Sequence, residues 1–169
     1  LMSFVVGEVI SYRNMCDAEG TQLQQGMNFR LRSGRTVILM SRRPNAPYSD
    51  SISDDGSTIK YEGHDVPKNL TETPKLVDQT STLPSGKLTQ NGFFFKAAKK
   101  HSIDGEDPES VRVYEKIIPG SWVFNGTFYL VDAHKEFNGT RFVFKFILNR
   151  IDDDLNKINQ LDKSHTRYI

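Results

Sequence analysis

The second half of the chain contains strand-like runs separated by turn signals, and this arrangement limits the folds open to it. The runs are Val111–Ile118, Trp122–Val131 and Arg141–Arg150. Pro119-Gly120 and Asn138-Gly139 lie between them, and Asn125-Gly126 lies inside the second run, where it predicts a hairpin turn. Short strands at this spacing predict an α+β fold with few helices, in which a curled, barrel-like and mostly antiparallel sheet forms the body.

The first half supplies two further strands and the one predicted helix. Ser3–Ile10 is rich in Val and Ile, and Arg35–Ser41 contains a continuous apolar run typical of a buried strand. The polar residues Asn14–Gly26 indicate a long loop. Residues Val66–Lys87, rich in Pro, Thr, Ser and Lys, predict an irregular and mobile surface segment. Leu88–His101 is the predicted helix, with a threonine at its N-cap.

The segment Pro47–Asp65 has the most unusual composition of the chain. Tyr48 and Tyr61 flank a run of serines and aspartates that closes with Asp54-Asp55-Gly56. Such a run suits neither a buried strand nor a helix, and it predicts an exposed hairpin with Asp-Gly at the turn and Ser57–Tyr61 as the strand that leaves it. Two aromatic rings and a carboxylate acceptor on such a scaffold can hold a planar polar ring, and a nucleobase is one such ring.

Length and composition narrow the class of protein. At 169 residues, with 37% hydrophobic and 25% charged, the chain predicts one soluble globular domain. Its one cysteine, Cys16, excludes an internal disulfide and a Cys-based zinc site, and its four histidines lack ligand spacing, so we expect no metal and no cofactor. The sequence has no apolar run long enough to span a membrane and no signal-peptide pattern, which favours a cytoplasmic protein without a membrane partner.

Taken as an ordered set, these features resemble the SRA (YDG) domain, over Gly7 to about Arg150. The set is Tyr48-Ser-Asp50, then Asp54-Asp55-Gly56, then Tyr61-Glu62-Gly63. The resemblance is closest to the SRA-like N-terminal domain of bacterial HNH modification-dependent restriction endonucleases, in which phrases similar to RPNAPYSD, IKYEGHDVP and LTQNGFFF occur. It implies an SRA/PUA-like fold and a double-stranded DNA partner.

The resemblance also implies a site that binds modified cytosine, either 5-methyl or 5-hydroxymethyl, after the base has flipped out of the duplex. The implied pocket consists of Tyr48, Asp50, Ser51, Tyr61, Glu62 and Gly63. In it the two tyrosines sandwich the base, and backbone N–H groups around Gly63 face its O2 and N3 side. A carboxylate accepts from the N4 amino group. Asp50 is the first candidate, with Ser51 or Asp54 as alternatives, because the chain has an extra residue between the tyrosines.

Five arginines fall within residues 28–43, a run that contains no acidic residue although the net charge of the chain is only +1. They are Arg30, Arg32, Arg35, Arg42 and Arg43. Each alone is equally consistent with a solvated face. Together, beside a loop expected to straddle a duplex, they predict contacts with the DNA backbone.

The resemblance divides the chain into an SRA-like DNA-binding domain at residues 1–150 and a C-terminal helix or linker at 151–169. The helix is predicted by the spacing of Ile151, Leu155, Ile158 and Leu161. A nuclease domain would follow it, through which the protein could form a homodimer, and we expect no catalytic residue in this chain. The alternative is a stand-alone nucleic-acid or protein interaction barrel that shares the fold without recognising a modified base.

Overall fold

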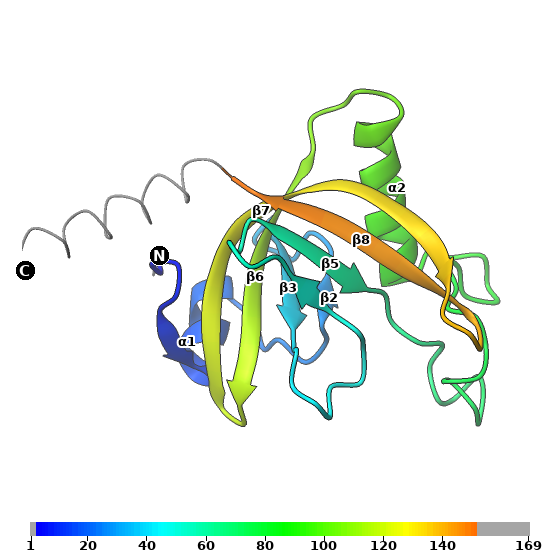
Figure 1. Cartoon of the computed structure of the whole chain (residues 1–169), viewed down its shortest axis with the longest axis horizontal. Coiled ribbons are helices and arrows are strands. Elements are labelled where there is room, and N and C mark those ends of the chain that lie inside the picture. The colour runs from blue at the N-terminus through cyan, green and yellow to red at the C-terminus, as the bar shows by residue number, and fades with distance from the viewer. Residues whose placement is uncertain (1–2, 152–169) are drawn as a thin grey trace, which may run out of the picture.

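The computed structural model describes residues 3–151, which form an eight-stranded sheet and two helices (Figure 1). The elements are β1 (Val9–Ser11), α1 (Tyr12–Glu19), β2 (Met27–Asn28), β3 (Thr36–Met40), β4 (Ser51–Ile52), β5 (Thr58–Glu62), α2 (Gln90–Ser102), β6 (Glu109–Ile118), β7 (Ser121–Phe137) and β8 (Phe142–Arg150). The strand order is β2-β3-β6-β7-β8-β5-β4, and β1 pairs with β7. All pairings except β3 with β6 are antiparallel. The predicted α+β fold with a curled sheet is confirmed, although the sheet does not close into a barrel.

The strands β6, β7 and β8 form the arch of the molecule. β6 turns into β7 at Pro119-Gly120, and β7 turns into β8 around Asn138-Gly139, so both predicted turns are confirmed. The predicted hairpin at Asn125-Gly126 is wrong, because β7 runs through it. The register with β6 shifts there, which makes this pair a β-bulge in which Gly126 has a φ of 110°. An Asn-Gly pair supplies a positive φ, and a bulge uses it as readily as a turn does.

Two predictions for the N-terminal region are wrong. The loop expected at Asn14–Gly26 begins inside helix α1, whose N-cap Ser11 accepts a hydrogen bond from the Asn14 N–H. Gly20 ends this helix in the left-handed conformation, with φ 72°. Of the strand expected at Ser3–Ile10, only Val9 and Ile10 belong to a strand, β1, which pairs with β7 and ends at Ser11.

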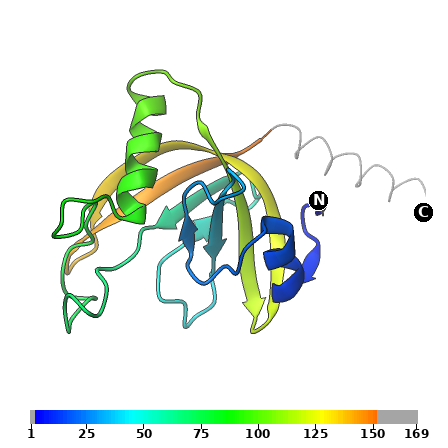
Figure 2. The same cartoon turned by 180° about the vertical axis from the view of Figure 1, so that it is seen from behind.

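The hydrophobic core lies between the arch and helix α2, which packs against β7 and β8 (Figures 1 and 2). Phe94 of α2 is fully buried and meets Phe146 of β8 edge-on, with 5.8 Å between the ring centroids. The helix itself is confirmed, and its predicted cap Thr89 accepts from the Gly92 N–H. A second cluster beside α1 includes Met15, Tyr114 and Phe124.

The segment 66–87 is irregular, as predicted, but it is anchored to the sheet rather than hanging free. The Gln79 N–H donates to the Phe142 carbonyl, and its buried side chain accepts from the Phe144 N–H and donates to the Gly63 carbonyl. The buried guanidinium of Arg141 donates to two carbonyls of the segment, those of Pro74 and Val77. These hydrogen bonds hold the segment beside the β7–β8 turn.

Two further expectations concern the C-terminal helix and membrane-spanning segments. The predicted helix beginning at Ile151 lies outside the described residues except for Ile151 itself. Within the described part of the chain, neither helix is long and apolar enough to cross a membrane.

Candidate nucleic-acid interface

The loop from Ser41 to Asp50 joins β3 to the β4–β5 hairpin and carries two of the predicted site residues, Tyr48 and Asp50. Both carboxylate oxygens of Asp50 accept backbone hydrogen bonds, one from the Ser41 N–H at 3.3 Å and one from the Glu62 N–H at 3.0 Å. The carboxylate therefore ties the loop to the ends of β3 and β5. The hairpin has the predicted Asp-Gly turn, in which Asp55 accepts from Ser53 and Ser57.

A cavity of about 300 Å³ lies on one side of this loop. Tyr48, Asp50 and Tyr61 all line it, so the structure brings three predicted site residues to one cavity. His64 and Trp122 complete two of its walls. The cavity has both aromatic rings and an acceptor carboxylate, which is the chemistry needed to hold a nucleobase.

The ring of Tyr48 is covered on both sides. The imidazole of His64 stacks on it, with ring centroids 4.6 Å apart and the planes 7° from parallel. The ammonium of Lys75 lies 4.2 Å from the ring centroid and makes a cation–π contact. The Tyr48 hydroxyl accepts from the Asp65 N–H at 3.1 Å, which fixes the ring at its far end.

Tyr61 is placed differently from the exposed hairpin residue that the sequence predicted. It is 1% exposed and belongs to the hydrophobic core, because β5 pairs with β8 and directs this side chain inward. Its hydroxyl donates to the Leu39 carbonyl at 3.2 Å and lies 3.0 Å from His64 Nε2. Burial raises the pKa of Tyr61 well above its usual value. In this structure the ring stacked on Tyr48 is therefore His64 and not Tyr61.

His64 is a cavity residue that the sequence reasoning missed. The spacing of the histidines argues only against a metal site. The signal for a cavity residue is the aromatic ring next to Gly63 in the Tyr-Glu-Gly-His run. Burial lowers the pKa of His64 to about 4, so the imidazole is neutral at physiological pH. Because the Tyr61 hydroxyl donates to Leu39, hydrogen-bond satisfaction assigns the His64 proton to Nε2.

Asp50 has a pKa close enough to neutral pH for its carboxyl group to change protonation state under mildly acidic conditions. Burial raises its pKa to about 6, and the neighbouring Glu62 charge also raises it, while the hydrogen bonds from Glu62 and Ser41 N–H groups oppose the shift. The group is thus mainly ionised at pH 7.5 and can accept a hydrogen bond. Of the three candidate base readers, only Asp50 lines the cavity; Ser51 and Asp54 are exposed on the hairpin.

The backbone around Gly63 does not match its implied role as a set of free donors. The Gly63 N–H donates to the Phe144 carbonyl at 2.9 Å within the sheet. The N–H groups of His64 and Asp65 donate to Asn91 and Tyr48. Because these N–H groups already have partners inside the protein, a base could accept from them only after those hydrogen bonds break.

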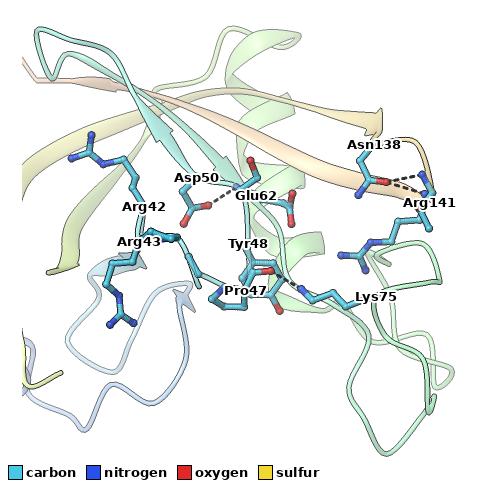
Figure 3. A pocket seen from close by; sticks show the side chains of 13 residues that line it. Arg42, Arg43, Pro47, Tyr48, Asp50, Glu62, Lys75, Asn138 and Arg141 are labelled. Atoms are coloured by element: carbon cyan, nitrogen blue, oxygen red, sulfur yellow. Dashed lines mark hydrogen bonds between the residues drawn. The ribbon is translucent and has the colours of Figure 1, made fainter. Parts of the chain in front are cut away.

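A polar groove of about 490 Å³ also borders the Ser41–Asp50 loop and shares Tyr48 and Asp50 with the cavity (Figure 3). Arg42 and Arg43 flank it on one side and Lys75 and Arg141 on the other, with Tyr48, Asp50 and Glu62 between them (Figure 3). Buried Glu62 forms an ion pair with Lys145 at 3.2 Å, and Lys145 also donates to the Ser49 carbonyl. Lys145 thereby supports the loop between Tyr48 and Asp50.

The five arginines that the sequence predicts to contact the DNA backbone fall into two groups in the structure. Arg42 and Arg43 line the groove, where Arg42 also holds Glu115 with two hydrogen bonds of 2.6 and 2.9 Å. The other three lie elsewhere: Arg30 pairs with Glu109, Arg35 lies 3.7 Å from Glu19, and Arg32 is exposed in the turn before β3. The sequence reasoning missed the groove cations Lys75 and Arg141, because they come from distant segments.

No group of three or more metal-binding side chains occurs within residues 3–151. No family model matches the sequence, and no curated protein matches it. Solved structures do match.

The SRA domain of SUVH5 in complex with hemimethylated CG DNA has a TM-score of 0.60 and 23% identity, covering 89% of this chain and 91% of that one. The same domain bound to fully hydroxymethylated CG DNA has a TM-score of 0.59 and 23% identity, covering 88% and 90%. The sulfur binding domain and SRA domain of ScoMcrA, complexed with phosphorothioated DNA, match with a TM-score of 0.53 and 18% identity, covering 89% of this chain and 40% of that one.

Proposed function

Since the chain has the fold of SRA domains, we propose that it binds double-stranded DNA containing modified cytosine and takes the flipped base into the 300 Å³ cavity. The observation that carries the proposal is that Tyr48 and Asp50 from the loop before β4, and Tyr61 from strand β5, border this one cavity. Structures of similar fold bound to methylated and hydroxymethylated DNA support the choice of ligand.

The chemistry of the cavity suits a cytosine ring. The Tyr48 ring provides a stacking surface worth about 1–3 kcal/mol, which offsets the cost of unstacking the base from the duplex. The ionised Asp50 accepts from the N4 amino group, and it rejects thymine, whose O4 offers only an acceptor at the same position. A 5-substituent adds about 1–3 kcal/mol of discrimination over plain cytosine.

The polar groove suits the DNA backbone. Arg42, Arg43 and Lys75 present cations around the loop that carries Tyr48, whereas the guanidinium of Arg141 is buried and paired with Asp65. A flipped nucleotide brings its flanking phosphates close to the mouth of the cavity, and guanidinium groups bind phosphates well. These contacts are independent of sequence and would supply affinity rather than selectivity.

This DNA-binding domain would belong to a modification-dependent restriction endonuclease, in which a separate domain cuts the DNA. Two observations support this part of the proposal: the resemblance of the RPNAPYSD and IKYEGHDVP phrases, and the presence of an SRA domain beside another domain in ScoMcrA. The test is cleavage by the parent protein of modified but not unmodified plasmid, and its loss in a Tyr48→Ala variant.

The binding proposal is tested with three duplexes that are identical except for cytosine, 5-methylcytosine or 5-hydroxymethylcytosine at one position. At fixed salt, we expect at least one modified duplex to bind about 5- to 100-fold more tightly than the plain one. A thymine at the same position serves as the control for Asp50. Equal affinity for all duplexes would favour an interaction barrel that shares only the fold.

A further inference from the structure

We infer that the His64 ring holds the place of the flipped base in the free protein, and that the base displaces it by turning it into a neighbouring cavity. This inference rests on the proposed function. It adds a specific movable residue to the site and predicts that this residue opposes binding.

The imidazole makes the contacts that the cavity would offer a flipped pyrimidine. It stacks on Tyr48 at 4.6 Å with nearly parallel planes, and its Nε2 edge lies 3.0 Å from the Tyr61 hydroxyl. Its lowered pKa keeps it neutral, as a cytosine ring is. A base that stacks on the same face of Tyr48 must therefore remove this ring first.

The structure provides both a fixed backbone and room for the ring to move. The buried Asn91 side chain accepts from the His64 N–H at 2.9 Å and donates to the His64 carbonyl at 2.8 Å, which clamps the main chain on both sides. A second cavity of about 480 Å³ is lined by His64, Val66, Pro67 and Gln90. His64 thus lies between two cavities and can turn from one toward the other while its backbone stays in place.

The flipped base could instead stack on the opposite face of the Tyr48 ring. There Lys75 covers the ring, donates to the Pro47 carbonyl at 2.6 Å and pairs with Asp65 at 2.8 Å. This side opens onto the polar groove, whose walls suit phosphates. The His64 face opens onto the smaller cavity shared with Tyr61 and Asp50, which suits a base. The two faces therefore make opposite predictions for the His64 and Lys75 variants.

The test compares His64→Ala and Lys75→Ala with the wild-type chain, and His134→Ala serves as the control because His134 is partly exposed on β7 and lines neither cavity. Stopped-flow fluorescence follows 2-aminopurine placed next to the modified cytosine. We expect His64→Ala to bind the modified duplex about tenfold more tightly, the combined value of one aromatic contact and one hydrogen bond. Its association should also be faster, and binding to the plain duplex should be unchanged.

A second measurement does not depend on a variant. In the free protein the His64 ring protons should be shifted by the Tyr48 ring current, and saturating modified duplex should remove that shift while plain duplex leaves it. Weaker binding by His64→Ala, or a shift that persists in the complex, would overturn the inference and make His64 a stacking partner. A Lys75→Ala gain without a His64→Ala gain would also overturn it. If wild type shows no preference for modified DNA, the proposed function fails and the inference fails with it.

Discussion

Among single residues, Tyr48 is the one that we expect to contribute most to the proposed binding, because it contributes little to the core. Its ring is partly exposed and contacts His64 and Lys75 rather than core side chains. Tyr48→Ala should weaken binding to modified DNA by about 1–3 kcal/mol, the value of one stacking contact. Tyr129→Ala is the matched control, because Tyr129 is 38% exposed on β7 and lines neither the cavity nor the groove. Unchanged affinity in Tyr48→Ala would show that this ring only shapes the loop.

Asp50 should make the recognition of modified cytosine depend on pH. Its pKa of about 6 means that lowering the pH from 7.5 to 5 protonates most of the carboxylate and removes the ionised acceptor. We expect affinity for the modified duplex to fall by about tenfold over this range, while binding to plain DNA serves as the baseline. His64 titrates near 4 and does not contribute within this window.

The raised pKa of Asp50 should also make the free energy of unfolding depend on pH. Because the folded-state pKa of Asp50 lies above its ordinary value of 3.8, the folded protein binds this proton more tightly than the unfolded chain. The contribution of Asp50 to the free energy of unfolding therefore rises as the pH falls from about 6 toward 4. Urea titrations at several pH values should show this trend in the wild type and lose it in Asp50→Asn. A binding profile that stays pH-dependent in Asp50→Asn would assign the effect to another group.

Tyr48 and Asp50, which the sequence predicts as site residues, both line a cavity, and local composition alone identifies the unusual loop that carries them. It could not foresee the burial of Tyr61, since that depends on which strand β5 pairs with. The pairing of β5 with β8 places Tyr61 opposite Phe146 and so inside the core. The same limitation hid His64 and Lys75, whose positions against Tyr48 arise from contacts between separate segments.

At the scale of elements, the arginine run illustrates how strand ends redistribute a sequence cluster. Arg42 and Arg43 follow β3 and reach the groove, whereas Arg30 precedes it and pairs with Glu109 at the other end. Arg43→Ala should lower the slope of log affinity against log salt by about one, as expected for one lost phosphate contact. Arg30→Ala should leave the slope unchanged, and an equal loss in both variants would contradict this division.

The segment 66–87 tests how the irregular part of the fold is held. Gln79→Ala would leave the buried Phe144 N–H and Gly63 carbonyl without their partner. Each unsatisfied group costs about 1–3 kcal/mol, so for the two groups we expect the free energy of unfolding to fall by about 2–6 kcal/mol. Gln24→Ala, at an exposed position, should change it by less than about 0.5 kcal/mol. A similarly small change in Gln79→Ala would show that the segment does not depend on this residue.

The sequence predicts best those elements that their own local composition indicates. Helix α2 and the turns at Pro119-Gly120 and Asn138-Gly139 form where composition alone indicates them. Helix α1 is harder to predict because its apolar residues Tyr12, Met15 and Cys16 span only about one turn of a largely polar run, and the burial of Met15 and Ala18 stabilises it. The bulge at Asn125-Gly126 arises from pairing along the whole of β7, which no short window reveals.

In the whole molecule, the two segments that border the polar groove come from different parts of the chain and meet at Tyr48 and Lys75. The loop from Ser41 to Asp50 and the segment 66–87 both extend below the sheet in the two views (Figures 1 and 2). Tyr48 of the loop contacts Lys75 of the segment, and Arg141 joins the segment to the β7–β8 turn. The sheet supplies the rigid frame, and the two loops supply the groups that would contact DNA.

The same arrangement predicts that the chain binds DNA without cutting it. Cleavage of a phosphodiester needs a metal ion or a general base aligned with an attacking nucleophile. The two acids that border the groove are already engaged: Asp50 accepts two backbone N–H groups, and Glu62 is paired with Lys145. We expect methylated or hydroxymethylated plasmid to remain intact with Mg²⁺ or Mn²⁺ under conditions in which filter retention shows it to be bound. Nicking that follows the purified chain and disappears in Asp50→Asn or Glu62→Gln would contradict this prediction and assign catalysis to the groove.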